Sequence, residues 1–164
     1  MKRPPPKAEP TTTPAAPAET TLPPAASQGG NQLLVALAQY PTADEHTRND
    51  IAEHLAGLAD KGIAKADIAR ALGSMFAIEQ SVIIKNSILD ELSALGDSSV
   101  LEQVTVGLSP SQPLEVRDEA ISILQELGDK RAIPTLQPLL ADPDENIRDA
   151  ARDAINSLNN RRAP

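Results

Sequence analysis

The hydrophobic positions of this chain follow the period of an α-helix from about Leu33 onwards. Val116, Ala120 and Leu124, for example, share one stripe when residues are placed at intervals of about 100°, and Leu127 continues it. No stretch keeps the two-residue alternation that a half-buried strand would show. The pattern therefore predicts an all-α fold.

The helical pattern repeats along the chain. Arg117 and Arg148 are 31 residues apart, and each is followed by apolar residues at matching positions. A period of about 20–50 residues indicates a stack of repeated units. The same register extends back through Lys85 to Arg48, which makes four copies. The two apolar rows are Leu55, Leu92, Leu124 and Ile155, and Leu58, Leu95, Leu127 and Leu158. We therefore expect one domain of four helix pairs in residues 31–160.

Capping and turn residues predict where the helices of each pair begin and end. Asn31 can cap the first helix, Pro41 ends it, and Thr42 or Asp44 begins the second helix. This second helix is short and polar, as expected of a terminal repeat with one face in water. Glycines close the first three pairs: Gly62, Gly96 and Gly128.

The last copy, residues 128–158, resembles the HEAT repeat in the short form first noted in phycobilisome-lyase-like proteins. Gly128 lies in its turn, Pro134 in its first helix, and Asp142 and Arg148 have the family's spacing of six. The resemblance implies a right-handed α-solenoid of about four HEAT-like helix pairs. It also implies that the second helices line the concave side, and that the Asp and Arg positions form a ladder between repeats.

The earlier copies depart from the Asp and Arg pattern of the family. The residues six before Arg117, Lys85 and Arg48 are Ser111, Glu79 and Thr42. Only the last copy therefore has the expected pair. We predict that the ladder between repeats is interrupted.

Composition and charge narrow the classes of function. The 164 residues are 40% hydrophobic and 1% aromatic, so the core must consist of aliphatic side chains. The net charge of −8 argues against nucleic-acid binding, which needs a basic surface. The absence of cysteine excludes disulfides, thiol catalysis and thiolate metal sites. No apolar run approaches the roughly 20 residues of a membrane span.

Residues 1–30 are predicted to be a disordered tail or linker rich in Pro, Ala and Thr. They contain eight of the fifteen prolines and too few apolar residues to form a core. The basic start has no apolar region after it, so no signal peptide is seen and the cytoplasm is the default compartment. One alternative is a docking tail whose proline runs bind an aromatic-lined groove. Another is a linker after a membrane anchor, which would place the domain in the periplasm or at the bacterial envelope.

One polar face of the second helices is a candidate binding surface for a protein partner. These residues lie opposite the apolar stripe of each helix, and many are acidic. The acidic balance would favour a partner with a basic surface, although an ordinary solvated helix face is the simpler interpretation. The residues proposed for binding are Glu53, Asn86, Asp90, Asp118, Ser122, Gln125, Asp149 and Asp153.

Residues with catalytic or metal-binding potential are few. His46 and His54 are eight positions apart with no neighbours that complete a ligand set, so we expect surface histidines. Asp142, Asp144 and Glu145 resemble part of a calcium loop but lack its glycine and terminal glutamate, which favours turn and cap roles. No phosphate-binding loop or nucleophile elbow occurs. We predict no catalytic residue, cofactor or metal.

Three hypotheses for function follow. The preferred one is a non-catalytic protein-interaction or scaffold module, monomeric on its own, that binds its partner on the concave face. The second is an enzyme subunit or a chromophore-lyase-like protein, which the resemblance to phycobilin lyases implies. The third is a structural accessory of a bacterial envelope assembly.

Overall fold

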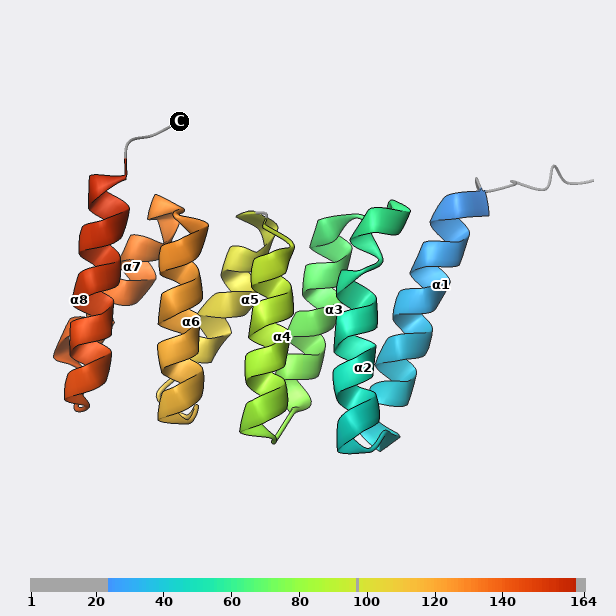
Figure 1. Ribbon diagram of the computed structural model, residues 1–164, viewed down its shortest axis with the longest axis horizontal. Coiled ribbons are helices and arrows are strands. Elements are labelled where there is room, and N and C mark those ends of the chain that lie inside the picture. The colour runs from blue at the N-terminus through green and yellow to red at the C-terminus, as the bar shows by residue number, and fades with distance from the viewer. Residues whose placement is uncertain (1–23, 97, 162–164) are drawn as a thin grey trace, which may run out of the picture.

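The computed structural model describes residues 24–96 and 98–161, which form α-helices and short 3-10 segments without any β-strand (Figure 1). The all-α prediction is therefore confirmed. The α-helices are α1 Pro24–Gln39, α2 Glu45–Ala56, α3 Lys65–Ile78, α4 Val82–Ala94, α5 Leu101–Thr105, α6 Leu114–Leu127, α7 Ile133–Leu136 and α8 Glu145–Asn160. The 3-10 segments are Tyr40–Thr42, Ala59–Lys61, Ser98–Val100, Val106–Leu108, Lys130–Ala132 and Gln137–Ala141. The expectations for residues 1–23 lie outside the described residues.

The helices form pairs that stack in two layers. In Figure 1, α2, α4, α6 and α8 stand side by side in the front layer, and α1, α3, α5 and α7 lie behind them. Each second helix packs on the next one along the stack, and α2 and α4 are in closer contact than α1 and α3. The inner layer of a curved stack is the more closely spaced one. This packing is what we expect if the second helices line the concave side.

The first helix begins earlier than the sequence predicts. It starts at Pro24 instead of Asn31, so the expected boundary between tail and domain falls inside α1. Proline is well tolerated in the first turn of a helix, where its missing N–H would have no partner. Gly29 is buried, and a Cβ placed on it would lie only 1.7 Å from the Ile63 side chain. The glycine therefore allows close packing of α1 and does not end the helix.

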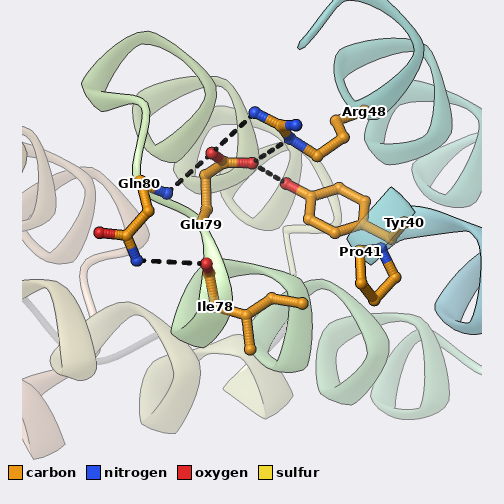
Figure 2. Close-up of a pocket in the computed structure, with 6 residues that line it drawn as sticks. All are labelled: Tyr40, Pro41, Arg48, Ile78, Glu79 and Gln80. Carbon is orange, nitrogen blue, oxygen red and sulfur yellow. Dashed lines mark hydrogen bonds and ion pairs between the residues drawn. The ribbon is translucent and has the colours of Figure 1, made fainter. Parts of the chain in front are cut away.

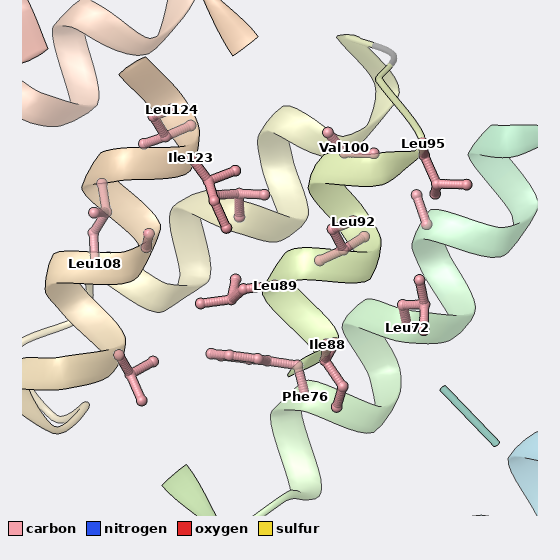
Figure 3. Close-up of a cluster of buried hydrophobic side chains, with 14 of the residues drawn as sticks. Leu72, Phe76, Ile88, Leu89, Leu92, Leu95, Val100, Leu108, Ile123 and Leu124 are labelled. Atoms are coloured by element: carbon pink, nitrogen blue, oxygen red, sulfur yellow. The ribbon is translucent and has the colours of Figure 1, made fainter. Parts of the chain in front are cut away.

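One hydrophobic core runs between the two layers from α1 to α8. The residues of the predicted apolar rows belong to it: Leu55, Leu58, Leu92, Leu95, Leu124 and Leu158 are buried, and Leu127 and Ile155 are partly buried. Figure 3 shows the middle of this core, with Leu72 and Phe76 of α3 facing Ile88 and Leu92 of α4. The helical phase read from the sequence is thus correct in the second helices.

Caps and glycine turns set the limits of the second helices. Asp44 caps α2 by accepting a hydrogen bond from Thr47 N (2.8 Å), and Asp144 caps α8 by accepting one from Asn146 N (2.9 Å). The cap of α2 is therefore Asp44, one of the two predicted residues. The glycines that close the first three pairs all have positive φ, which side-chain-bearing residues rarely adopt: Gly62, Gly96 and Gly128.

The first helices of the last two pairs are short. α5 has five residues and α7 has four, and a 3-10 segment follows each of them. Pro138 lies in the segment after α7 and lacks the N–H that would continue the α-helical bonding. Within the described residues, no helix has both the length and the apolar character needed to cross a bilayer.

Candidate partner-binding face

The exposed surface of α2, α4, α6 and α8, which we call the second-helix face, contains most of the residues proposed for binding. Six of the eight are exposed: Glu53, Asp90, Asp118, Ser122, Asp149 and Asp153. Asn86 and Gln125 are only partly exposed, and Asn86 Oδ1 is buried without a hydrogen-bond partner among the described residues. The role of these eight residues in partner binding stays a prediction.

Two ion pairs, each with a buried carboxylate, connect consecutive helix pairs beneath this face. Arg48 Nε of α2 lies 2.8 Å from Glu79 Oε2, and the Glu79 side chain is only 1% exposed. Arg117 of α6 binds both carboxylate oxygens of Asp142, and the two side chains are 5% and 6% exposed. Each cation therefore reaches from one second helix to the turn of the next pair.

A hydrogen bond from a lysine to a neutral amide lies between these two ion pairs. Lys85 Nζ donates a hydrogen bond to Gln112 Oε1 (2.6 Å) and lies 5.4 Å from the centre of the Phe76 ring. The series of ion pairs is thus interrupted at Lys85, as predicted, because its acceptor is an amide oxygen and not a carboxylate, but a hydrogen bond takes the place of the missing pair. Glu79 replaces the family's aspartate with a longer side chain, and Gln112 acts from one position beyond Ser111.

The ladder contacts turn three cations of the second helices towards groups of the next helix pair, so these cations do not balance the acidic residues of the second-helix face. The four second helices contain twelve Asp and Glu residues but only five Lys and Arg residues. Three of these cations belong to the ladder, and Arg148 donates hydrogen bonds to two backbone carbonyls of the preceding turn, at 2.7 and 3.0 Å. The fifth, Arg152, pairs with Asp149. The exposed charge of this face is therefore predominantly negative.

Carboxylates of neighbouring second helices influence one another. Burial raises the pKa of Glu91 on α4, and the negative charges of Glu53 on α2 and Asp90 on α4 raise it further. Burial also raises the pKa of Glu119 on α6, with added contributions from Asp90 and other carboxylates nearby. The acidic side chains of α2, α4 and α6 thus form one negative region, and among the described residues no cation lowers the pKa of Glu91 or Glu119.

Sequence reasoning did not select Glu91 and Glu119 for this face. The proposed residues all lie nearly opposite the apolar stripe, whereas Glu91 and Glu119 lie on the flanks of their helices and face a neighbouring second helix. Each directly follows an acidic residue that was selected, Asp90 and Asp118. That adjacency is a signal that could have identified them.

A hollow lies between the turns of the first two helix pairs (Figure 2). It has a volume of about 200 Å³ and is lined by Tyr40, Pro41, Arg48, Ile78, Glu79 and Gln80. Tyr40 Oη donates a hydrogen bond to Glu79 Oε2 (2.6 Å), and the backbone N–H groups of Gln80 and Ser81 donate to Glu79 Oε1 at 2.8 and 2.9 Å. The carboxylate of Glu79 is therefore surrounded by donors.

These contacts fix the protonation states of Tyr40 and Glu79. Burial and the neighbouring Glu79 carboxylate raise the pKa of Tyr40, so the phenol keeps its proton. Burial opposes ionisation of Glu79, but the hydrogen bonds from Tyr40, Ser81 and Arg48 outweigh it and lower the pKa to about 2. A phenol and a carboxylate fixed in this way join the first two helix pairs, and neither titrates near neutral pH.

The other candidate residues have structural contacts that explain them. His46 is exposed and its Nε2 lies 3.7 Å from Asp50, and His54 is also exposed. Asp142 belongs to the ladder and Asp144 caps α8, in agreement with the expected turn and cap roles. In residues 24–96 and 98–161, no group of three or more His, Asp or Glu side chains could hold a metal ion.

Comparisons with known proteins agree with this architecture. Residues 101–164 match the HEAT repeats. Among solved structures, human deoxyhypusine hydroxylase in complex with glycerol superposes with a TM-score of 0.66 and 18% sequence identity, covering 82% of this chain and 44% of the hydroxylase chain. Identity at this level shows a shared fold alone, and this chain spans less than half of the hydroxylase. No curated protein matches the sequence. The finer likeness to phycobilisome-lyase-like proteins stays a prediction.

Proposed function

We propose that this chain, whose residues 101–164 match the HEAT repeats, is a non-catalytic interaction scaffold that binds a basic protein partner on its second-helix face. The described residues provide a stack with a continuous core and one acidic layer of helices. We propose further that residues 1–23 act as a spacer.

The ladder is the observation that supports this proposal most directly. Cations on the second helices could have neutralised the face, but Arg48 and Arg117 are bound to carboxylates of the next pair and Lys85 is bound to Gln112. The remaining exposed acids are therefore available to a partner. Complementary charge of this kind accelerates encounter and discriminates against partners of the same sign.

The electrostatic coupling within the face adds a second reason. Glu91 and Glu119 have raised pKa values because each is partly buried beside other carboxylates. Holding like charges together is unfavourable in the free protein. A partner that brings Lys or Arg side chains next to them would relieve that repulsion, so binding of a basic surface gains free energy from it.

Matched charge variants test the proposal. Tagged protein would first capture a partner, which mass spectrometry would identify. Its Kd would then be measured for a face variant, Glu53→Gln/Asp90→Asn/Asp118→Asn, and for a control variant that removes three negative charges elsewhere, Asp60→Asn/Asp67→Asn/Glu102→Gln. Glu53, Asp90, Asp118, Asp60 and Glu102 are exposed and Asp67 is partly exposed, so both variants should stay folded.

The expected result is weaker binding for the face variant and little change for the control. Binding should also weaken as salt rises, because exposed charges beyond about 10 Å are screened at 0.1 M ionic strength. Equal losses in both variants would show that only net charge matters. Binding that is insensitive to both variants would contradict the proposal outright.

A further inference from the structure

The second-helix face also carries exposed aliphatic side chains, at the end where α4 and α6 begin. Ile83 is 75% exposed, the most of any large hydrophobic residue described, and Leu114 is 48% exposed. They are the second residue of α4 and the first residue of α6. A single exposed aliphatic residue is ordinary, but these two lie on adjacent helices of the same face.

Helix geometry places both side chains beside the acidic residues. Asp90 follows Ile83 by seven positions, close to two full turns, so the two share one side of α4. Asp118 follows Leu114 by four positions and is its neighbour on α6. The helices α4 and α6 pack side by side and begin at the same edge of the stack (Figure 1). The aliphatic pair therefore borders the negative region directly.

A hollow next to Leu114 can receive an apolar group. It lies between the N-terminal turns of α6 and α8 and has a volume of about 250 Å³. Buried Ile147 contributes to its lining, so its surface is partly apolar. The residues that line it are Leu114, Glu115, Asp118, Asp144, Asn146 and Ile147. We call Ile83, Leu114 and this hollow the aliphatic notch.

The charge around the notch is negative. Each helix N-terminus contributes roughly half a positive charge, so α6 and α8 together contribute about one. Three carboxylates line the hollow, those of Glu115, Asp118 and Asp144, and no lining residue is a cation. The neighbouring arginines are bound elsewhere, Arg117 to Asp142 and Arg148 to backbone carbonyls. The local balance is therefore about −2.

We propose that the aliphatic notch docks a short amphipathic segment of the partner protein that presents aliphatic side chains together with Lys or Arg. One aliphatic group contacts Ile83, another enters the hollow beside Leu114, and the cations meet Asp90, Glu115 and Asp118. An amphipathic helix that lays its apolar face into a hydrophobic groove is an established mode of peptide recognition. This inference rests on the proposed function and identifies where on the face, and by which chemistry, the partner is recognised.

Synthetic peptides of one length provide the test. The probe is a helical peptide with a leucine stripe flanked by lysines, and its matched control keeps the lysines but replaces the leucines with glutamines. Binding of fluorescent peptide would be measured by anisotropy for the wild type, for Ile83→Ser/Leu114→Ser and for Leu34→Ser/Val35→Ser. Leu34 and Val35 are 67% and 46% exposed on α1, outside the second-helix face. If circular dichroism shows that the double variant is misfolded, the test is repeated with a milder variant, Leu114→Ala.

The inference predicts that the leucine peptide binds the wild type at least about tenfold more tightly than the glutamine peptide, because anchor residues dominate interface energies. The notch variant should lose that preference, and the α1 variant should keep it. Equal binding of both peptides, or an equal loss in both variants, would overturn the inference.

The outcome separates this inference from the proposed function. If the notch variants bind the captured partner as the wild type does while the face variant does not, the notch inference fails and the acidic scaffold stands. If neither set of variants affects the partner, both fail. If the notch variants lose the leucine peptide and the partner together, the inference holds.

Discussion

Breaking the buried ion pair between Arg117 and Asp142 should destabilise the stack far more than breaking an exposed pair. Both side chains are at least nine-tenths buried, and Asp142 also accepts a hydrogen bond from Asp144 N (3.0 Å). Arg117→Met or Asp142→Leu alone leaves an uncompensated buried charge, which costs about 3–5 kcal/mol. Asp142→Leu should lie at the upper end, because it also removes the bond to Asp144, worth about 1 kcal/mol.

The double variant Arg117→Met/Asp142→Leu should recover much of this loss. It removes both charges together, and Arg117 Nε is already buried without a hydrogen-bond partner among the described residues, so part of the desolvation penalty also disappears. We expect a coupling energy of about 2–4 kcal/mol from the cycle. The exposed pair of Arg152 and Asp149, with side chains 55% and 60% exposed, provides the control and should couple by less than about 1 kcal/mol.

Urea unfolding followed by far-UV circular dichroism measures these differences, provided that the slope of free energy against denaturant stays constant across variants. The cycle requires two-state unfolding, so near-UV or calorimetric melts should agree with the helical signal. A coupling energy for Arg117 and Asp142 as small as that of the exposed pair would refute the reasoning. It would mean that the ladder contact is not maintained in solution.

Three further predictions concern the core and the turn between α3 and α4. Because the pKa of Glu79 is lowered to about 2 from an ordinary 4.5, its ionised form stabilises the fold above pH 4.5, and this stability is lost as the pH falls through about 2. The difference in melting temperature between the wild type and Glu79→Gln should therefore shrink as acid is added. Gly107→Ala places a Cβ 2.8 Å from the Ala120 methyl, so urea melts should show a loss of about 1–3 kcal/mol. Leu124 is fully buried, so Leu124→Ala should lose about 2–5 kcal/mol, whereas the partly exposed Gln125→Ala should lose well under 1 kcal/mol.

The repeat register and the core could be predicted from the sequence because they depend on spacing alone. Once Arg117 and Arg148 were aligned, the positions of Leu124 and Leu158 in the core followed from helical periodicity. Capping chemistry likewise identified Asp44 as one of two candidates for the start of α2. These features are local, so one sequence is enough to find them.

The ladder could not be predicted because it depends on side-chain reach across a turn. A strict search for Asp six residues before each cation rejects Glu79, although one extra methylene lets its carboxylate meet Arg48 at 2.8 Å. The same search selects Ser111 and misses Gln112, since the loop before α6 moves the acceptor by one position. Similarly, the sequence alone suggests that Gly29 ends the tail before the first helix. Only the structure shows that it lies inside α1 and allows close packing against Ile63.

The acidity of the candidate site was predictable, but its organisation was not. Asp90 and Asp118 follow from the helical wheel of each separate helix. The coupling of Glu91 with Glu53, and of Glu119 with Asp90, arises only when neighbouring helices are packed together. The aliphatic notch depends in the same way on the distance between α6 and α8.

Carboxylate footprinting of the complex tests the central claim most directly. Carbodiimide coupling of an amine to Asp and Glu would be quantified by mass spectrometry, with and without the captured partner. Binding on the second-helix face predicts that the partner protects Asp90, Asp118 and Glu53, while Glu102 on α5 continues to react. Protection of Glu102 with unchanged labelling of the other three carboxylates would contradict the account.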